Sequence, residues 1–374
     1  MNSFSIKTKI IYGDNALNYL EKFKDSKVFV VADPYLVESR KIDIVTNHLN
    51  IEKSFIFSKV EPDPHTGLII DGVEDIKAFG PEGIVAVGGG SAIDTAKAII
   101  NMAGKLEAKE KPEFIAIPTT SGTGSEVTSF AVITDREKNV KIPLIDDEMI
   151  PDVAILEDEF LKTIPKTIVA DTGMDVLTHA IEAYVATNAS EFSDAYAKQA
   201  IRMVFDYLQR SYRDANDMEA RRKMHAASCM AGIAFNNAGL GLNHALAHSI
   251  GGIFHISHGK INSVLLTNVI KFNSTVAAKE YEKLAKVFGI NISSHTLCVK
   301  GIEREIKNLQ QKLNMPMNLC ECGISKEALI NRKDEIIKGA LNDACIRTNP
   351  RIVSQSDLEK MYDGLLCKPE MLRR

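Results

Sequence analysis

Residues 83–100 read GIVAVGGGSAIDTAKAII, a short apolar run that ends in three glycines and continues into an amphipathic helical segment. Three other apolar runs in the first half of the chain, at 27–33, 54–57 and 114–117, have the composition of buried strands. Strands of this kind that alternate with helices are typical of a parallel sheet covered by helices. We therefore predict an α/β N-terminal domain with a Rossmann-like parallel sheet.

Two small-residue turns follow two of these predicted strands. Residues 88–91 (GGGS) follow one, and residues 119–125 (TTSGTGS) follow another. Ligands of open parallel sheets bind beyond the carboxyl ends of the strands, and a glycine turn at a helix start lets a pyrophosphate approach the backbone. The triple glycine does not match the Gly-x-Gly-x-x-Gly pattern, so an ordinary strand-to-helix turn is an equal alternative.

Two aspartates of the first half have two readings each. Asp33 ends a predicted strand, where a carboxylate can accept hydrogen bonds from ribose hydroxyls and repel the extra phosphate of NADP. This reading favours NAD, whereas the alternative is an aspartate that opens a turn with Pro34. Asp94 lies near the start of the helix after the glycines, where it could bind ligand hydroxyls or only suit the helix dipole.

The pattern of apolar residues changes after Pro165. Runs with helical periodicity then dominate, for example at 195–208, 221–234 and 281–288, and strand-like runs are few. We therefore predict an all-α C-terminal domain, with the division between residues 1–165 and 166–374.

Acidic and imidazole side chains gather in two remote segments, TGMDVLTHAIEAY (172–184) and GLGLNHALAHSIGGIFHISHG (239–259). On a helix, Asp175 and His179 share one face. A carboxylate with neutral imidazoles is a ligand set for iron or zinc, although a single buried histidine is more often a core residue. An ionised Asp175 in an apolar helix needs a positive partner. Because no Lys or Arg lies between Lys166 and Lys198, a metal ion is the simplest partner, and a basic side chain from a distant part of the sequence is the alternative.

These two segments resemble the metal-binding stretches of the iron-type (group III) alcohol dehydrogenases, and the likeness covers nearly the whole chain. Shorter segments near the ends, at 2–5 and 347–351, resemble the propanol dehydrogenases of the propanediol-utilisation type. The resemblance implies a dehydroquinate synthase-like architecture. It also implies four metal ligands, namely Asp175, His179, His244 and His258.

The resemblance assigns further roles near the metal. His248 is expected beside substrate and cofactor, where it relays the alcohol proton as a catalytic residue. His255 is expected in the active-site wall, although its spacing to His258 also suits a ligand. The cofactor-binding residues that the resemblance implies are Gly88, Gly89, Gly90, Ser91, Thr119, Thr120, Thr123 and Lys141, which join Asp33 and Asp94 from the strand and helix positions above. A solvated surface lysine is the alternative for Lys141.

The implied function is a metal-dependent, NAD(H)-linked alcohol dehydrogenase that interconverts short-chain primary alcohols, such as 1-propanol, and aldehydes. Fe2+ is the expected metal and Zn2+ the alternative, and the bound ion would act as a Lewis acid. A related diol, lactaldehyde or butanol oxidoreductase is the first alternative. A lyase like the dehydroquinate synthases would need basic residues for phosphate, which the metal segment hardly offers. A non-catalytic metal-binding scaffold is the last alternative.

The charge and composition of the chain limit the partners that can be expected. The 374 residues carry a net charge of −4 and no basic run, so nucleic acid is not expected as a partner. No 18-residue apolar run or signal-peptide core occurs, so we expect a cytoplasmic protein without membrane contact. We expect the six cysteines to be reduced thiols. The family resemblance adds a homodimer or larger homo-oligomer, and association with a bacterial microcompartment.

Overall fold

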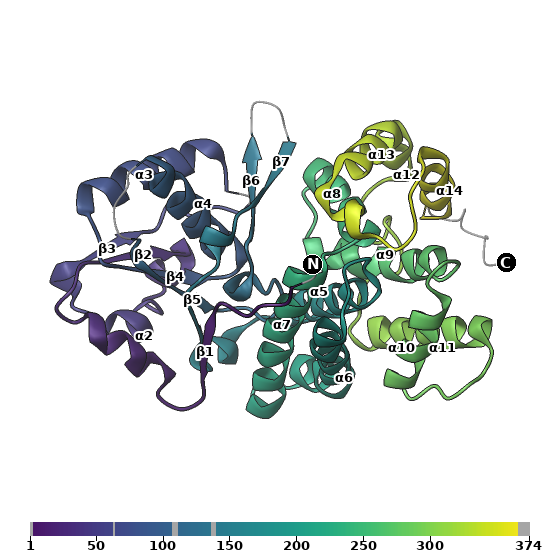
Figure 1. The fold of residues 1–374 in the computed structure, drawn as a ribbon, viewed down its shortest axis with the longest axis horizontal. Helices are drawn as coiled ribbons and strands as arrows, with labels where there is room; N and C mark the ends of the chain where they lie inside the picture. The colour runs from purple at the N-terminus through teal and green to yellow at the C-terminus, as the bar shows by residue number, and fades with distance from the viewer. Residues whose placement is uncertain (1–2, 63, 107–110, 136–139, 366–374) are drawn as a thin grey trace.

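The computed structural model describes residues 3–62, 64–106, 111–135 and 140–365. Figure 1 shows the strands gathered in one half of the molecule and a group of helices in the other. The first half consists of the N-terminal part of the chain, and the helical half begins with the long helix α5 (Lys166–Val185).

A parallel sheet forms the first half. Within the described residues it has six strands in the order β1-β8-β5-β4-β2-β3. Their bounds are Lys9–Tyr12 (β1), Val153–Leu156 (β8), Glu113–Pro118 (β5), Gly83–Gly88 (β4), Val28–Ala32 (β2) and Ser54–Phe57 (β3). The four predicted strands are confirmed as β2, β3, β4 and β5. The strands β1 and β8, each of four residues, were not predicted.

Both faces of this sheet are covered. Alternate residues of β2 point to opposite sides, so that Phe29 packs with α3 (Thr66–Phe79) and α4 (Gly90–Leu106), whereas Val30 packs with Leu36 of α1 (Pro34–Glu38) and Val45 of α2 (Asp43–Thr46). This double burial explains why the strands read as continuous apolar runs. A separate antiparallel hairpin joins β6 (Phe130–Asp135) to β7 (Val140–Ile145).

The helical half is built around α5, in which every residue from Gly173 to Val185 is buried. It packs against α6 (Glu191–Arg213), α7 (Met218–Ala238) and α9 (His258–Asn273). The other helices are α8 (Leu242–Phe254), α10 (Ala278–Val287), α11 (His295–Lys312), α12 (Lys326–Asn331), α13 (Lys333–Asn342) and α14 (Gln355–Leu365). The predicted helical runs lie in α6, α7 and α10, and the described part of the chain has no strand after β8, so the predicted fold class is confirmed. Among the described residues, no helix combines the length and the apolar character that crossing a bilayer requires.

The cysteines require one correction. Cys229, Cys298, Cys322 and Cys345 carry free thiols, as expected. Cys320 is disulfide-bonded, so the expectation of reduced thiols was wrong for this residue. Disulfide formation depends on how close two cysteines lie in the folded chain, and sequence spacing does not show that distance.

Candidate metal and cofactor site

Three acidic or imidazole side chains lie along one face of α5. Asp175, His179 and Glu182 follow one another at four and three residues, and each is at most 5% exposed. This spacing places them one above another on the helix. Because neighbouring helices seal α5 from solvent, the three side chains must find their polar partners inside the protein.

Three predicted ligands lie close together at this face. Asp175 Oδ1 lies 3.8 Å from His244 Nε2 and 3.8 Å from His258 Nε2, and one ligand atom from each of the three residues lies within 4.8 Å of the others. His244 belongs to the first turn of α8, and His258 is the first residue of α9. The fold thus joins the two remote sequence segments at one point.

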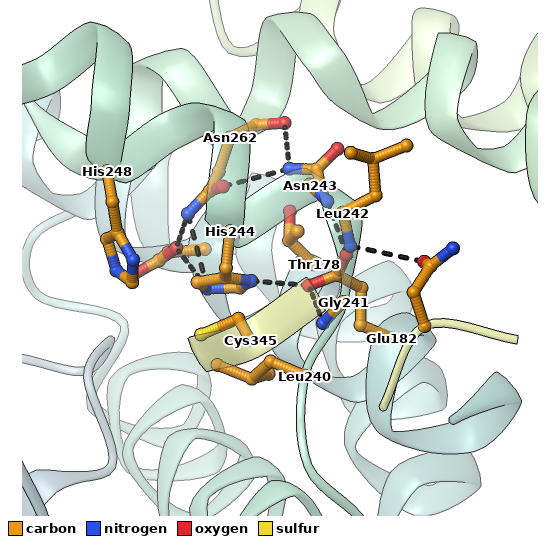
Figure 2. A network of polar contacts seen from close by, with 12 residues as sticks. Thr178, Glu182, Leu240, Gly241, Leu242, Asn243, His244, His248, Asn262 and Cys345 are labelled. Carbon is orange, nitrogen blue, oxygen red and sulfur yellow. Dashed lines mark hydrogen bonds and ion pairs between the residues drawn. The ribbon is translucent and has the colours of Figure 1, made fainter. Parts of the chain in front are cut away.

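An amide nitrogen occupies the centre of this group. Asn262 Nδ2 lies 2.6 Å from Asp175 Oδ1, 3.0 Å from His258 Nε2 and 3.3 Å from His244 Nε2. Asn243 Nδ2 donates to Asn262 Oδ1 at 2.8 Å, which fixes the orientation of the Asn262 amide (Figure 2). One carboxylate oxygen and two imidazole nitrogens of the predicted ligands thus converge on a single amide nitrogen.

Glu182 fixes the tautomer of His244. Its carboxylate accepts from the backbone nitrogens of Gly241 at 3.1 Å and Asn243 at 2.6 Å, and lies 2.6 Å from His244 Nδ1 (Figure 2). If Nδ1 carries the proton, Nε2 presents its lone pair to Asp175 and Asn262, which is the arrangement of metal-bound histidines. Sequence reasoning gave Glu182 no role, although its position seven residues after Asp175 on the same helix face was the available signal.

The buried carboxylates at this point have no balancing basic side chain within residues 3–62, 64–106, 111–135 and 140–365. Burial raises the pKa of Asp175 to about 7, against a hydrogen bond from Asn262, and burial also raises the pKa of Glu182 to about 7. Burial and the nearby His248 hold the pKa of His244 well below its usual value, so its ring is neutral. Among the described residues no Lys or Arg pairs with Asp175. Two buried carboxylates beside a neutral imidazole therefore suit a cation.

His179, the fourth predicted ligand, lies beside this group rather than in it. Its ring stacks on His244 at 4.5 Å and on Phe235 at 4.6 Å between centroids. Its Nδ1 is buried and has no hydrogen-bond partner in the described part of the chain. Burial, followed by the nearby His244, keeps the pKa of His179 well below its usual value. A neutral imidazole with an unpartnered buried nitrogen is consistent with a ligand, and its assignment stays a prediction.

His248 lies next to the predicted ligands. Its ring stacks on that of His258 at 5.1 Å, and its Nδ1 lies 2.9 Å from Asp343 Oδ2. Burial acts to raise the pKa of Asp343, but the hydrogen bond and charge of His248 and the backbone N–H of Cys345 lower it to about 2. Asp343 is therefore an ionised acceptor that orients the His248 ring. Sequence reasoning missed Asp343, because nearly a hundred residues separate it from His248.

His255 and its neighbours lie at the end of α8. His255 is the exposed C-terminal cap of this helix, with a left-handed φ of 53°. Ile253 and Phe254 pack against the apolar cluster of the C-terminal helices. The group of converging ligand atoms found in the described residues does not include His255.

The two small-residue turns meet at the carboxyl ends of β4 and β5. Thr119 N donates to Gly88 O at 3.0 Å. A Cβ at Gly89 would lie 3.4 Å from Thr120 Oγ1, and a Cβ at Gly90 would lie 2.8 Å from Thr123 Cγ2. A side chain on this turn would fill the space between the turns, so the glycines keep the backbone accessible at the start of α4. Such a cradle fits the pyrophosphate of a dinucleotide.

The remaining predicted cofactor residues differ in their surroundings. Asp33 is partly exposed beside Gly88, and its side chain also caps α1 by accepting from Tyr35 N at 2.9 Å. Both predicted readings of Asp33, a ribose acceptor and a turn aspartate, are therefore compatible with its position. Asp94 accepts from Ser125 Oγ at 2.7 Å and from Val132 N at 3.1 Å. Ser91 lies in the first turn of α4, and Lys141 lies in β7, with its side chain outside the described part of the structure.

Comparisons with known proteins identify the family of this chain. The family described as iron-containing alcohol dehydrogenase matches residues 7–158, and the C-terminal part of the Fe-containing alcohol dehydrogenase family matches residues 169–366. The chain belongs to the iron-containing alcohol dehydrogenase family. Alcohol–aldehyde interconversion is the activity of this family of oxidoreductases.

Three relatives illustrate the range of this alcohol dehydrogenase family. The 1-propanol dehydrogenase PduQ of Salmonella typhimurium is 39% identical over 371 residues, which cover 98% of this chain and 100% of that protein. The NADPH-dependent butanol dehydrogenase of Clostridium saccharobutylicum is 39% identical, with 97% of each chain covered. A crystal structure of 1,3-propanediol oxidoreductase superposes with a TM-score of 0.90 at 30% identity, covering 98% of this chain and 100% of that one.

Proposed function

We propose that this chain reduces short-chain aldehydes, such as propanal, to primary alcohols with NADH, and catalyses the reverse oxidation. The observation that carries the proposal is the convergence of Asp175 Oδ1, His244 Nε2 and His258 Nε2 on one point, where no Lys or Arg of the described residues pairs with Asp175. A divalent metal fits this donor set, which contains oxygen and nitrogen but no thiolate. When bound, the metal supplies Lewis acidity toward the substrate oxygen.

The chain's own residues hold this metal. Asp175, His179, His244 and His258 are its proposed ligands, with Fe2+ as the first expectation and Zn2+ as the alternative. Glu182 keeps His244 in the tautomer that presents Nε2, through the 2.6 Å contact at Nδ1. Asn262 orients Asp175 through its hydrogen bond of 2.6 Å. Partners of this kind raise the basicity of the ligand and fix the direction of its lone pair.

His248 moves the proton. Asp343 accepts from Nδ1 of His248 at 2.9 Å, which leaves Nε2 as the nitrogen that exchanges a proton with substrate. Because burial around Asp343 is incomplete and its pKa is low, this carboxylate stays ionised and stabilises the protonated imidazole. His248 thus gives a proton to the product oxygen during aldehyde reduction and takes one during alcohol oxidation.

A bound dinucleotide would be held at the carboxyl ends of β4 and β5. Gly88, Gly89, Gly90 and Ser91 would hold its pyrophosphate, and Thr119, Thr120, Thr123 and Lys141 would line its nicotinamide side. The cofactor would supply the hydride chemistry. Asp94 acts through Ser125, to which it is hydrogen-bonded. Asp33 accepts from the ribose hydroxyls and favours NADH over NADPH, although a butanol dehydrogenase relative uses NADPH.

Propanal is the proposed aldehyde because the propanol dehydrogenase relative matches along its full length. Butyraldehyde and hydroxyaldehydes are the alternatives, which follow the names of the other relatives. We further propose a homodimer or larger homo-oligomer in the cytoplasm, in association with a bacterial microcompartment.

The test uses purified protein stripped of metal and reloaded with Fe2+ or Zn2+. Propanal, butyraldehyde and lactaldehyde are each supplied with NADH or NADPH, and loss of the reduced cofactor is measured. We expect the fastest oxidation with propanal and NADH, and none without metal. No oxidation with either metal, together with intact metal binding, would leave a non-catalytic scaffold as the explanation.

A further inference from the structure

The loop of residues 119–129, which carries the proposed nicotinamide threonines, lies against one face of α7. The residues of α7 that meet this loop include His225, Gly232 and Asn236, at intervals of seven and four residues. This spacing puts them along one stripe of a helix. The loop belongs to the α/β half and α7 to the helical half, so the stripe joins the two halves.

A partly buried hydrogen bond forms the first contact of this stripe. Ser121 Oγ lies 3.0 Å from Nδ1 of His225, whose side chain is 2% exposed. Ser121 stands between Thr120, which faces the glycine turn, and Gly122, where a Cβ would lie 2.6 Å from Thr172 Cβ of α5. The Ser121–His225 contact therefore fixes the loop where it passes from the cofactor turn to the helix that carries Asp175.

The next contact is backbone against backbone. A Cβ on Gly124 would lie 2.7 Å from Gly232 Cα, and a Cβ on Gly232 would lie 2.9 Å from Gly124 O. Further along, Asn236 Oδ1 accepts from Ser129 N at 2.9 Å and from Ser129 Oγ at 3.1 Å. Both contacts leave the loop little freedom to move away from α7.

The opposite side of the loop is held by α4. Lys97 Nζ donates to Ser125 Oγ at 2.9 Å, to Thr128 Oγ1 at 3.1 Å and to Phe130 O at 2.9 Å. Phe235, on α7, stacks on His179 of α5 at 4.6 Å. Helix α7 thus touches both the cofactor loop and His179, a proposed metal ligand.

We propose that α7 sets the distance between the nicotinamide loop and the metal helix, and that His225 is a positioning residue for hydride transfer through its contact with Ser121. This inference rests on the proposed function. Hydride transfer requires the reacting carbons at a fixed separation, and a displacement of about 1 Å can cost about 100-fold in rate. His225 touches no reacting atom, so it acts only through the loop.

The surroundings of His225 argue against a role in stability alone. Its Nε2 is buried and has no hydrogen-bond partner among the described residues. Burial lowers the pKa of His225 to about 4, so the ring is neutral. A buried polar atom without a partner destabilises the fold, and an aromatic hydrocarbon of similar size would avoid that penalty. A histidine at this position is therefore better explained by the contact that its other nitrogen makes.

The test compares His225→Phe, Ser121→Ala and His225→Asn with the unsubstituted metal-loaded enzyme. Phenylalanine keeps the volume and removes the contact, whereas the asparagine amide can replace Nδ1. For His225→Phe and Ser121→Ala we expect kcat with propanal and NADH to fall about tenfold, with a larger isotope effect from NADH deuterated at the transferred position. Metal content and Tm should stay unchanged or, for His225→Phe, Tm should rise. His225→Asn should recover most of kcat.

Amide hydrogen exchange gives a readout that does not depend on turnover. We expect faster exchange over residues 119–129 in His225→Phe and Ser121→Ala than in His48→Phe, a control in the α/β half. If kcat, isotope effect and loop exchange all match the unsubstituted enzyme, the proposal is overturned. A parallel loss of Tm, metal and activity that His225→Asn does not reverse would also overturn it. Failure of the proposed function is distinct, because it would appear as an inactive unsubstituted protein.

Discussion

The metal cluster and the dinucleotide turns use different physical means. At the metal cluster, function depends on side-chain atoms: an oxygen and two nitrogens converge within 4.8 Å, and each is held by a further buried partner. At the turns, function depends on backbone shape, because glycines keep side chains out of the space beside Thr120 and Thr123. The metal site thus depends on side-chain atoms that are present, whereas the pyrophosphate site depends on side chains that are absent, so that the backbone of the glycine turn stays accessible.

This difference gives opposite expectations for mutations in the two regions. Loss of a side chain should empty the metal cluster and leave the cofactor turns intact. Addition of a side chain should block the turns and leave the metal cluster intact.

Asp175→Ala should have the largest effect. Asp175 is the only proposed ligand that carries negative charge, so we expect loss of the metal and a fall in turnover of at least about 1000-fold, with NADH affinity within about twofold of the unsubstituted enzyme. Metal analysis and steady-state rates measure the first two quantities, and equilibrium titration the third. Asp206→Ala, at an exposed position of α6, is the control. An Asp175→Ala protein with full metal content would remove Asp175 from the ligand set.

Glu182→Gln should have an intermediate effect on the same cluster. Glutamine keeps the shape of the side chain but replaces one carboxylate oxygen with an NH2 group. This group cannot accept from the donors that surround Glu182, namely His244 Nδ1 and the backbone nitrogens of Gly241 and Asn243. We expect metal affinity to fall by about 10- to 100-fold, as for other partners of metal-bound histidines. Excess metal should restore kcat, in contrast with Asp175→Ala. Unaltered metal affinity would show that Glu182 stabilises the fold without tuning His244.

The same difference explains what could be predicted from the sequence. The α/β and helical halves follow from apolar periodicity, and residue types indicate a metal site in the segments 172–184 and 239–259, since both kinds of signal are local. The choice of Asp175, His244 and His258 as ligands came from the family resemblance. Asn262 has no such signal, and the only signal for Glu182 is its place on the same helix face as Asp175. The role of Asn262 depends on α9 and α5 crossing so that its amide nitrogen meets Asp175, His244 and His258 at once.

Contacts between remote segments were the other omission. Asp343 meets His248 only because α13 packs on α8, and His225 meets Ser121 only because α7 lies beside the cofactor loop. Neither pair has a spacing that a sequence pattern could detect. Asp94 also makes contacts that its place near a helix start did not predict, because its oxygens accept from Ser125 and Val132, and its cofactor role stays a prediction.

Gly88→Ala tests the cofactor turns by the addition of a side chain. A Cβ at Gly88 would lie 2.6 Å from the Cβ of Ala92, and the residue has a φ of 156° that side chains disfavour. We expect the backbone to shift and KM for NADH to rise about tenfold, since one misplaced pyrophosphate contact costs about 1.4 kcal/mol, with metal content unchanged. Gly104→Ala is the matched control, because a Cβ there meets nothing within 4 Å. Loss of metal in Gly88→Ala would mean that the two regions are not independent.

Asp33→Ser should have the smallest effect and refines the cofactor side of the comparison. Asp33 both caps α1 through Tyr35 N and places a negative charge at the end of β2 beside Gly88. Serine keeps the cap, since its hydroxyl can accept the same bond, and removes the charge that repels a 2′-phosphate. We expect the ratio of kcat/KM for NADPH to that for NADH to rise about tenfold, which corresponds to about 1.4 kcal/mol of lost repulsion, while Tm changes little. An unchanged ratio together with an unchanged Tm would assign Asp33 to the turn alone and would leave cofactor choice to other residues at the edge of the sheet.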